Sequence, residues 1–226
     1  MQPKLSVADF NKDNKTDVLV TSNNPGGIAI LLGNGDGTLQ NPSYFATEQY
    51  FRHLALTDLN RDTNVDVVTT GTNYSNSAIC ILLGTGDGKI GRTGIFCFPR
   101  AASWTEQIGC ADFNNDSIPD IVSSNAATSS VDLFLGNTNG TLQTPKSLST
   151  GVANTKIKIA DFNQDGRPDI VVAYYASFSG VSITLSVLLN NGDSTFSISF
   201  LLDRFTYIRE IGVADINSDN IADIIL

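Results

Sequence analysis

The residues with the clearest chemical potential form one nine-residue pattern, Asp-x-Asn-x-Asp-x-x-x-Asp. It occurs five times, beginning at Asp9, Asp58, Asp112, Asp161 and Asp215. If such a segment curls around a point, the side chains at its first, third, fifth and ninth positions converge, and the seventh position offers its main-chain carbonyl. Together they supply about six or seven oxygen donors when the last Asp binds through both oxygens, which is the donor type and number that Ca²⁺ prefers. The spacing therefore predicts five calcium-binding loops.

Other readings of the pattern are less favourable. Mg²⁺ demands a smaller octahedral site that keeps several waters, and Zn²⁺ favours His and Cys, which the loops lack. An EF-hand is excluded because the twelfth position carries no Glu and strand-like sequence flanks each loop. The remaining alternative is that Asp and Asn serve only to form turns. Turn formation alone does not require three carboxylates at a fixed spacing in five copies.

The sixth position of each loop distinguishes the five copies. The backbone bends sharply there, which favours glycine, and only Gly166 meets this requirement. Asn14 and Asn220 tolerate a left-handed conformation, whereas Thr63 and Ser117 tolerate it poorly. The second and third loops are therefore expected to be the least favourable calcium sites.

Apolar runs flank each loop, such as LSVADF before the first copy and DVLVT after its start. Between the copies lies a glycine-rich pattern, LLGNGDGTLQ in the first case, which is typical of a hairpin turn. Each repeat is thus predicted to contain four short strands, and the repeats begin near residues 5, 54, 108, 157 and 211. The inner runs are apolar at consecutive positions, which indicates burial on both faces, as when each small sheet stacks between two others.

Four-stranded units of this length predict an all-β fold, a β-propeller of antiparallel blades spanning residues 1–226 as one domain. A β-helix would need shorter repeats. The sequence holds four complete repeats and half of a fifth. We expect it to be part of a larger propeller, and the alternative is a five-unit ring closed with an incomplete blade.

Composition narrows the classes of partner. The chain has 226 residues, of which 41% are apolar, and a formal net charge of −9 at pH 7. This acidity argues against nucleic acid, whose phosphates require clustered Lys and Arg, and no run of 18 apolar residues predicts a membrane span. Asp accounts for 20 of the 23 acidic residues, and 15 of these lie in the five loops. Five bound Ca²⁺ ions would therefore bring the net charge close to zero.

The segments VADFNKDNKTDVLV, IADFNQDGRPDIVVA and GVADINSDNIADIIL, together with LLGNGDGTLQ, resemble the FG-GAP/VCBS repeat family. The resemblance covers essentially the whole chain. It implies the β-propeller of integrin α-subunits, several secreted lectins and many surface proteins, most commonly with seven blades. In these propellers the Asp-rich loop joins the first two strands of a blade and binds Ca²⁺. The implied ligand positions, with the seventh residue acting through its carbonyl, are Asp9, Asn11, Asp13, Lys15, Asp17, Asp58, Asn60, Asp62, Asn64, Asp66, Asp112, Asn114, Asp116, Ile118, Asp120, Asp161, Asn163, Asp165, Arg167, Asp169, Asp215, Asn217, Asp219, Ile221 and Asp223.

The three cysteines fall into two groups. Cys80 and Cys97 lie on the third and fourth expected strands of the second repeat, on either side of a glycine turn. They therefore face each other across a hairpin, either as a disulfide or as two small buried thiols. Cys110 replaces an apolar residue of a first strand and is expected in the core.

Catalytic patterns are missing from the sequence. The single His53 lies just before an expected first strand, with no Cys nucleophile or Gly-x-Ser-x-Gly pattern to serve, and a structural or surface role is expected for it. No Ser/His/Asp set, phosphate-binding glycine loop or Glu pair suggests itself. We therefore expect no enzymatic activity.

Blade topology places the ligand-binding surface. Loops between strands 1 and 2 and between strands 3 and 4 share one face, so the opposite face collects the 2–3 loops and the connections between blades. Aromatic and Arg residues gather there, which suits a protein or sugar surface; the alternative is that they pack between blades. The candidates are Tyr50, Arg52, Tyr74, Trp104, Tyr174, Tyr175, Tyr207 and Arg209.

Together these features predict a calcium-binding β-propeller interaction module that recognises an extracellular protein or carbohydrate through the face opposite the calcium loops, without inserting into a membrane. Extracellular sites bind Ca²⁺ at roughly 10⁻⁴–10⁻³ M and fill only where calcium is abundant. This favours an extracellular or cell-surface location, although the sequence carries no signal segment, as expected of a fragment. One alternative is an architectural repeat domain that flanks a catalytic domain in a longer secreted protein. The other is an enzyme using the central channel, for which no candidate residues lie outside the loops.

Overall fold

The computed structural model describes residues 4–23, 26–46, 50–73, 76–100, 107–125, 128, 130–150, 156–173, 183–205 and 210–226. All regular secondary structure in these residues is β-strand. Among them, no helix is long and apolar enough to cross a membrane. The all-β class predicted from the repeats is confirmed.

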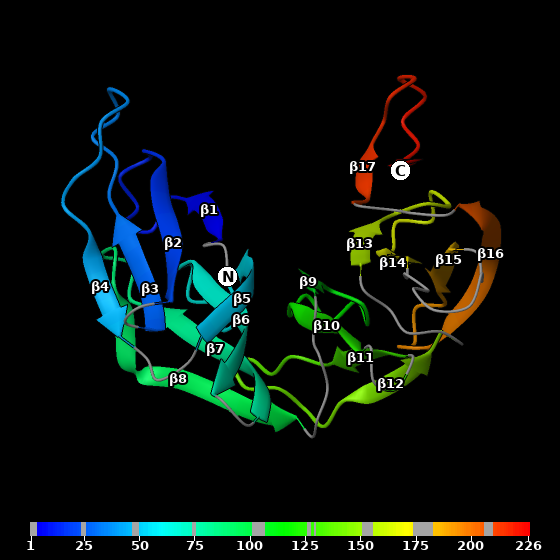
Figure 1. Ribbon diagram of the computed structural model, residues 1–226, viewed down its shortest axis with the longest axis horizontal. Coiled ribbons are helices and arrows are strands. Elements are labelled where there is room, and N and C mark those ends of the chain that lie inside the picture. Colours follow the sequence, from blue (N-terminus) through cyan, green and yellow to red (C-terminus); the bar gives the residue numbers. More distant parts are fainter. Residues whose placement is uncertain are drawn as a thin grey trace. The chain divides into compact units, whose positions relative to one another are not determined.

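The strands follow the repeats along the chain (Figure 1). In order they are β1 (Leu5–Ala8), β2 (Asp17–Asn23), β3 (Gly26–Leu31), β4 (Ser43–Ala46), β5 (Tyr50–Thr57), β6 (Asp66–Asn73), β7 (Asn76–Gly84), β8 (Ile90–Arg100), β9 (Ile108–Ala111), β10 (Asp120–Asn125), β11 (Ser130–Phe134), β12 (Lys146–Ser149), β13 (Lys156–Ala160), β14 (Asp169–Ala173), β15 (Ile183–Asn190), β16 (Phe196–Phe205), β17 (Gly212–Ala214) and β18 (Asp223–Ile225).

These strands form four four-stranded sheets and one two-stranded pair. Within each sheet, strands that follow each other in the chain lie side by side and pair antiparallel. The sheets are β1–β4, β5–β8, β9–β12 and β13–β16, and β17 pairs with β18. Each complete repeat is therefore one blade-like sheet, and the fifth repeat contributes half of one. Closure of these sheets into a ring, and the number of blades, stay predictions.

The chain divides into two compact units. One comprises Met1–Ala102 with Asn137–Thr141, and the other comprises Ser103–Gly136 with Leu142–Leu226. The first unit holds the first two sheets and the second holds the remaining strands. Each unit has its own apolar core.

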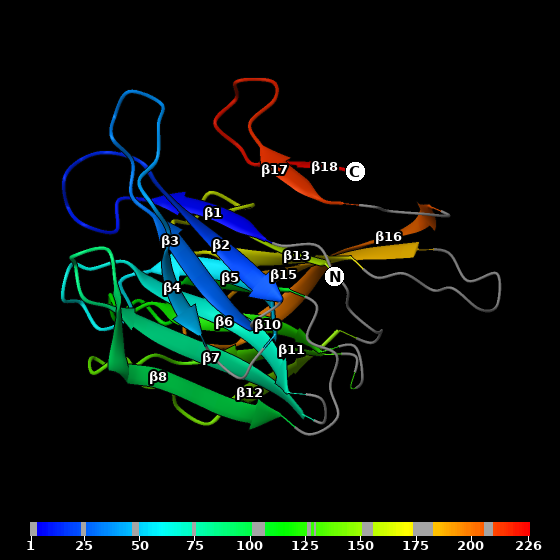
Figure 2. The same cartoon turned by 60° about the vertical axis from the view of Figure 1, so that its left-hand side comes forward.

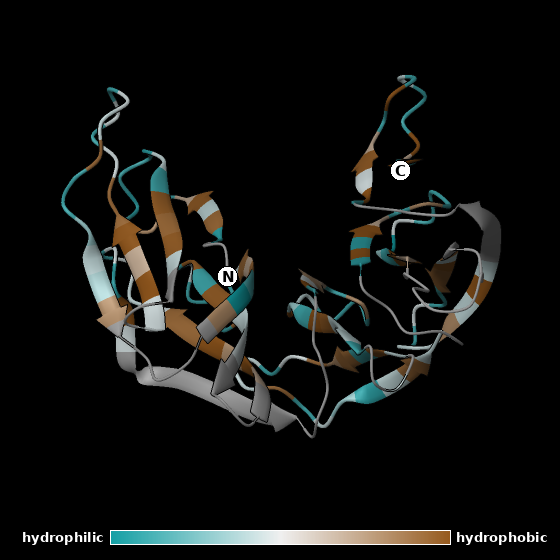
Figure 3. Ribbon diagram, viewed as in Figure 1, coloured by the Kyte–Doolittle hydropathy of each residue, from teal (hydrophilic) through white to brown (hydrophobic). Residues whose placement is uncertain are grey.

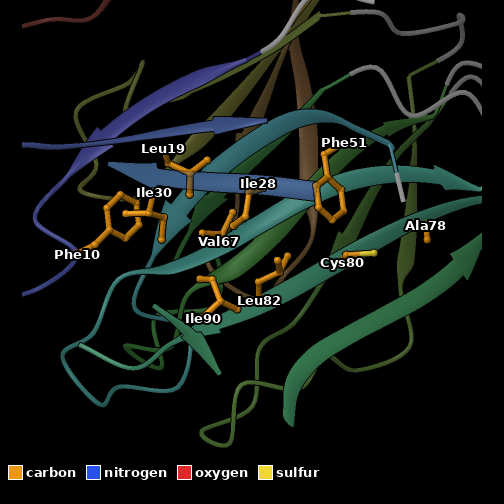
Figure 4. Packing of buried hydrophobic residues seen from close by; sticks show 10 residues of the cluster. All are labelled: Phe10, Leu19, Ile28, Ile30, Phe51, Val67, Ala78, Cys80, Leu82 and Ile90. Carbon is orange, nitrogen blue, oxygen red and sulfur yellow. The ribbon is translucent and has the colours of Figure 1, made fainter. Parts of the chain in front are cut away.

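In the first unit the core lies between the sheets β1–β4 and β5–β8 (Figure 4). Side chains from the facing sides of β2 and β3 and of β6 and β7 meet there, and Phe10 joins them from the first Asp loop. The buried members are Phe10, Leu19, Ile28, Ile30, Phe51, Val67, Ala78, Cys80, Leu82 and Ile90. In Figure 3 the strands of the first sheet are mostly apolar, whereas the loop between β1 and β2 is mostly hydrophilic.

In the second unit the sheet β13–β16 is covered on both sides. Val172 belongs to a cluster shared with β10 and β11, while its neighbour Val171 belongs to a second cluster that includes Ile211. Every residue of β14 is buried. Consecutive apolar residues in the inner strands therefore do reflect burial on both faces, as the sequence indicates.

The cysteines fall into the two expected groups, but Cys110 is only partly buried and not the fully buried core residue that the sequence predicts. Cys80 is disulfide-bonded, and the pairing of β7 with β8 places Cys97 directly opposite it. Cys110 is free and partly buried, and burial together with the nearby Asp120 raises the pKa of its thiol to about 12. The alternative of two buried thiols in the second repeat therefore does not hold for Cys80.

Candidate metal loops

The five Asp-rich loops all join the first two strands of their repeats. They connect β1 to β2, β5 to β6, β9 to β10, β13 to β14 and β17 to β18. Figure 2 shows that the first of these loops and the turn between β3 and β4 leave the same end of the first sheet. The predicted position of the loops within each sheet is thus confirmed.

All five loops share one backbone conformation. The fourth and sixth residues of each have positive φ angles, between 60° and 80°. Thr63 and Ser117 adopt φ angles of 67° and 65°, so the unfavourable residue types do not give the second and third loops a different backbone. The left-handed fourth position was not expected from the sequence, because residues as different as Lys12 and Gln164 occupy it.

A fixed set of hydrogen bonds holds each loop, and the first loop illustrates it. Asp9 Oδ1 accepts from the N–H of Asp13 (3.2 Å), and Asp9 Oδ2 accepts from the N–H of Asn14 (2.7 Å). Asn11 Oδ1 accepts from the N–H of Asp13, while Asn11 Nδ2 donates to Asp13 Oδ2 (3.1 Å). Asp13 Oδ1 accepts from the N–H of Lys15 (2.9 Å). These five bonds curl the chain around the first three polar side chains.

The same five hydrogen bonds recur at equivalent positions in the other four loops. The loops are therefore preformed by their own polar groups. This result agrees with the turn-forming reading of Asp and Asn, and it also explains how the first, third and fifth side chains come together.

The ninth Asp has a second, structural role. Asp17 is fully buried, and its Oδ2 and Oδ1 accept from the N–H groups of Phe10 and Gly33, both at 2.8 Å. Asp66, Asp120 and Asp169 bind the equivalent pair of main-chain donors. This carboxylate ties the Asp loop to the glycine turn of the same sheet. The sequence offered a signal for this role, because a glycine-rich turn follows the ninth Asp in each of the first four repeats.

Negative charge is concentrated in these loops. Burial raises the pKa of Asp66 to about 6, the N–H groups of Gly84 and Leu59 act in the opposite direction, and Asp62 and Asp58 raise it further. Asp120 shows the same pattern and the same value. The carboxylates of one loop therefore repel one another, and a bound cation would relieve this repulsion.

The loops fit Ca²⁺ in the type of their donors. Each offers carboxylate, amide and carbonyl oxygens and no nitrogen or sulfur ligand. A carboxylate oxygen that accepts one hydrogen bond keeps further lone-pair capacity. Among the described residues, no group of three or more His, Cys, Asp or Glu side chains is arranged as a formed metal centre.

Two of the eight candidates for a ligand-binding face, Tyr50 and Arg52, belong to the described residues. Six of the eight, Tyr74, Trp104, Tyr174, Tyr175, Tyr207 and Arg209, lie outside the described residues. Tyr50 is the first residue of β5, opposite Thr72, and Arg52 lies in an irregularity of β5 between Phe51 and His53.

His53 itself takes part in the sheet. Its main-chain carbonyl accepts a hydrogen bond from Thr69 Oγ1 (2.8 Å), and the residue pairs with Thr70 across β5 and β6. This agrees with the structural role expected from the sequence.

Comparison with known proteins defines the class. The family model of FG-GAP-like repeats matches residues 9–69, 58–123 and 112–172, which together span most of the chain. The chain therefore belongs to the FG-GAP-like repeat family. Each matched segment runs from one Asp loop into the next repeat, which agrees with the repeat boundaries seen in the sheets.

Two solved structures resemble the fold. An Agrocybe aegerita lectin, described for its specific recognition of non-reducing terminal N-acetylglucosamine, is 17% identical over 99% of this chain and 74% of its own, with a TM-score of 0.48. The Tc holotoxin pore of Photorhabdus luminescens is 16% identical over 99% of this chain and 11% of its own, with a TM-score of 0.55. The latter likeness supports the fold alone. A comparison with curated proteins finds no match.

Proposed function

We propose that this chain is a calcium-stabilised, non-enzymatic recognition module that binds an extracellular protein or carbohydrate. The observation that carries the calcium part is the repetition of one oxygen-lined loop, with the same hydrogen bonds and the same two left-handed residues, in all five repeats. Turn formation and the main-chain bonds of the ninth Asp account for the hydrogen bonds, but they leave the mutual repulsion of three carboxylates in each loop, which a bound cation would relieve.

The disulfide supports an extracellular setting. Cys80 is disulfide-bonded within the first unit, and disulfides persist in oxidising compartments and are rare in the cytosol. Calcium sites of extracellular modules bind at roughly 10⁻⁴–10⁻³ M, so they fill in the same compartments. The disulfide thus favours secretion or display at the cell surface, and the proposed calcium sites would fill in the same compartments.

Recognition is assigned to the face opposite the Asp loops. The 2–3 loops and the connections between repeats vary in sequence, and binding residues concentrate in such loops where strands hold them. Trp104 and Tyr174 are the aromatic anchors that we favour, because large aromatic residues dominate both protein and sugar contacts. The alternative, an architectural module beside a catalytic domain, requires no ligand on this face.

Thermal unfolding tests the calcium part. The melting temperature should fall when EGTA replaces about 5 mM CaCl₂, because free ligand well above its Kd stabilises the folded state by about 1.4 kcal/mol per tenfold excess at each site. MgCl₂ at the same concentration should restore little of the loss. A melting temperature that is unchanged in EGTA contradicts the proposal.

A glycan array and a screen against extracellular proteins test the recognition part, each run in calcium and in EGTA. Binding should require calcium and should be lost in the Trp104→Ala and Tyr174→Ala variants while their melting temperatures are retained. Binding that survives both substitutions contradicts the choice of face. Failure to bind any ligand favours the architectural alternative.

A further inference from the structure

The five loops differ in charge at their seventh position. The first and fourth loops carry a cation there, Lys15 and Arg167, whereas the third and fifth carry Ile118 and Ile221. The seventh position contributes only its carbonyl to the predicted ligand set, so its side chain is free to act in another way.

Arg167 folds back over its own loop. Its Nη2 lies 2.5 Å from Asp165 Oδ2, and its Nε donates to the main-chain carbonyl of Asn190 at 2.9 Å. Asp165 Oδ2 also accepts from Asn163 Nδ2 at 2.7 Å. The guanidinium therefore brings a positive charge to the fifth-position carboxylate and links the Asp loop to the strand end that leads into the glycine turn.

The first and second loops have weaker versions of this arrangement. Lys15 Nζ lies 3.6 Å from Asp13 Oδ2. The second loop has the neutral Asn64 at this position, but Lys12 of the first loop donates to its Thr63 Oγ1 at 2.7 Å. A lysine ammonium is a strongly hydrated point charge and holds a carboxylate less firmly than a guanidinium does.

The third and fifth loops have no such charge. Asp116 Oδ2 and Asp219 Oδ2 each accept from the Asn of their own loop, both at 2.9 Å. Within the part of the chain that the structure describes, no Lys or Arg nitrogen lies within 4.0 Å of a carboxylate in either loop. The hydrogen bonds given for their carboxylates among these residues all come from neutral donors.

We propose that Arg167 is a built-in counter-ion that makes the fourth loop less dependent on calcium than the third and fifth loops. The inference rests on the proposed calcium function and adds an order of filling to it. A metal ion that enters the fourth loop must displace the guanidinium from Asp165, whereas the third and fifth loops have no competing cation. These two loops accordingly fill at lower free calcium, and the fourth keeps its shape without metal.

The Arg167→Met variant tests this directly, because methionine keeps an unbranched apolar stem and removes the charge. In EGTA its melting temperature should fall by about 2–4 °C, the shift expected for the loss of one modest interaction in a chain of this size. In about 10 mM CaCl₂ it should melt within 1 °C of the wild type, because the metal then supplies the missing charge.

Two further variants complete the design. Lys89→Met is the matched control, since Lys89 Nζ pairs with Asp87 Oδ2 at 2.5 Å across the same two-residue spacing, but in a glycine turn. Its melting temperature should respond to calcium as the wild type does. Ile221→Arg is the converse variant at a partly exposed site. Its melting temperature in EGTA should be no lower than that of the wild type, and calcium should raise this temperature by less than it does in the wild type.

The possible results distinguish a failure of the counter-ion role of Arg167 from a failure of the proposed calcium function. If the wild type responds to calcium and Arg167→Met loses the same stability in EGTA and in calcium, Arg167 is only a structural clamp and the inference is overturned. An Arg167→Met variant that matches the wild type in both conditions overturns it as well. If the wild type itself ignores calcium, the calcium function fails, and the counter-ion role fails with it.

Discussion

At the scale of the residue, the ninth Asp of each of the first four loops has the most demanding environment, because it is fully buried. Asp66 is fully buried, and its two oxygens accept from Leu59 (2.9 Å) and Gly84 (2.8 Å). An amide in its place can accept only through one of its two terminal atoms, because the other is itself a donor. This residue type is therefore required by the fold whether or not metal is bound.

The Asp66→Asn variant should accordingly lose about 1–3 kcal/mol of unfolding free energy in EGTA, the cost of leaving a buried donor unsatisfied. Urea unfolding would measure it. Asp36→Asn is the matched control: Asp36 Oδ1 accepts from the exposed Thr38 N–H, and Asn139 already performs this task in the third repeat. Equal losses for the two variants would contradict the structural role of Asp66.

The thiol of Cys110 should react slowly with alkylating reagents in the folded protein. Burial raises the pKa of its thiol to about 12, so at pH 8.5 only about one molecule in three thousand carries the reactive thiolate. Reactivity should rise only as pH approaches 12. Iodoacetamide at pH 8.5 should therefore label no cysteine in the folded protein, one in urea, and three after reduction in urea, as counted by intact mass. Rapid labelling of the folded chain would contradict this assignment.

At the scale of the element, neighbouring sheets within each unit are held together by an apolar layer. Leu82 of β7 is fully buried in the core between the first two sheets, whereas Leu39, beyond β3, is 44% exposed. The Leu82→Ala variant should lose about 2–5 kcal/mol of unfolding free energy, because truncation leaves a cavity between two rigid sheets. Leu39→Ala should lose much less in the same urea titration. Similar losses would show that the sheets do not depend on this layer.

The strands and loops were largely predictable from the sequence, because each repeat could be compared with four others of the same pattern. The paired apolar runs, the Asp loops and the glycine turns together fixed the order of strands in every sheet. The positive φ of the fourth loop residue was not predictable, since unrelated side chains such as Lys12 and Ser218 adopt it. The contacts of Arg167 with Asp165 and Asn190 were not predictable either, because the side chain at the seventh loop position can point to solvent or back over the loop.

At the scale of the whole molecule, the chain is a series of similar sheets, and within each compact unit neighbouring sheets share an apolar core. In such arrays the free energy of folding is close to a sum of repeat and interface terms. A small gain at each loop therefore accumulates, and five loops carrying 15 of the 23 acidic residues would together shift the stability of the entire chain when a cation fills them.

If the acidic loops are calcium sites, the bound metal can be counted. The wild-type chain would be dialysed to equilibrium against about 2 mM CaCl₂, a concentration above the usual Kd of extracellular sites, and the bound calcium measured by atomic emission. We expect several bound calcium ions per chain, with a maximum of five. The double variant Asp112→Asn/Asp116→Asn in the third loop should bind one ion fewer. Less than one bound ion per chain would contradict this expectation.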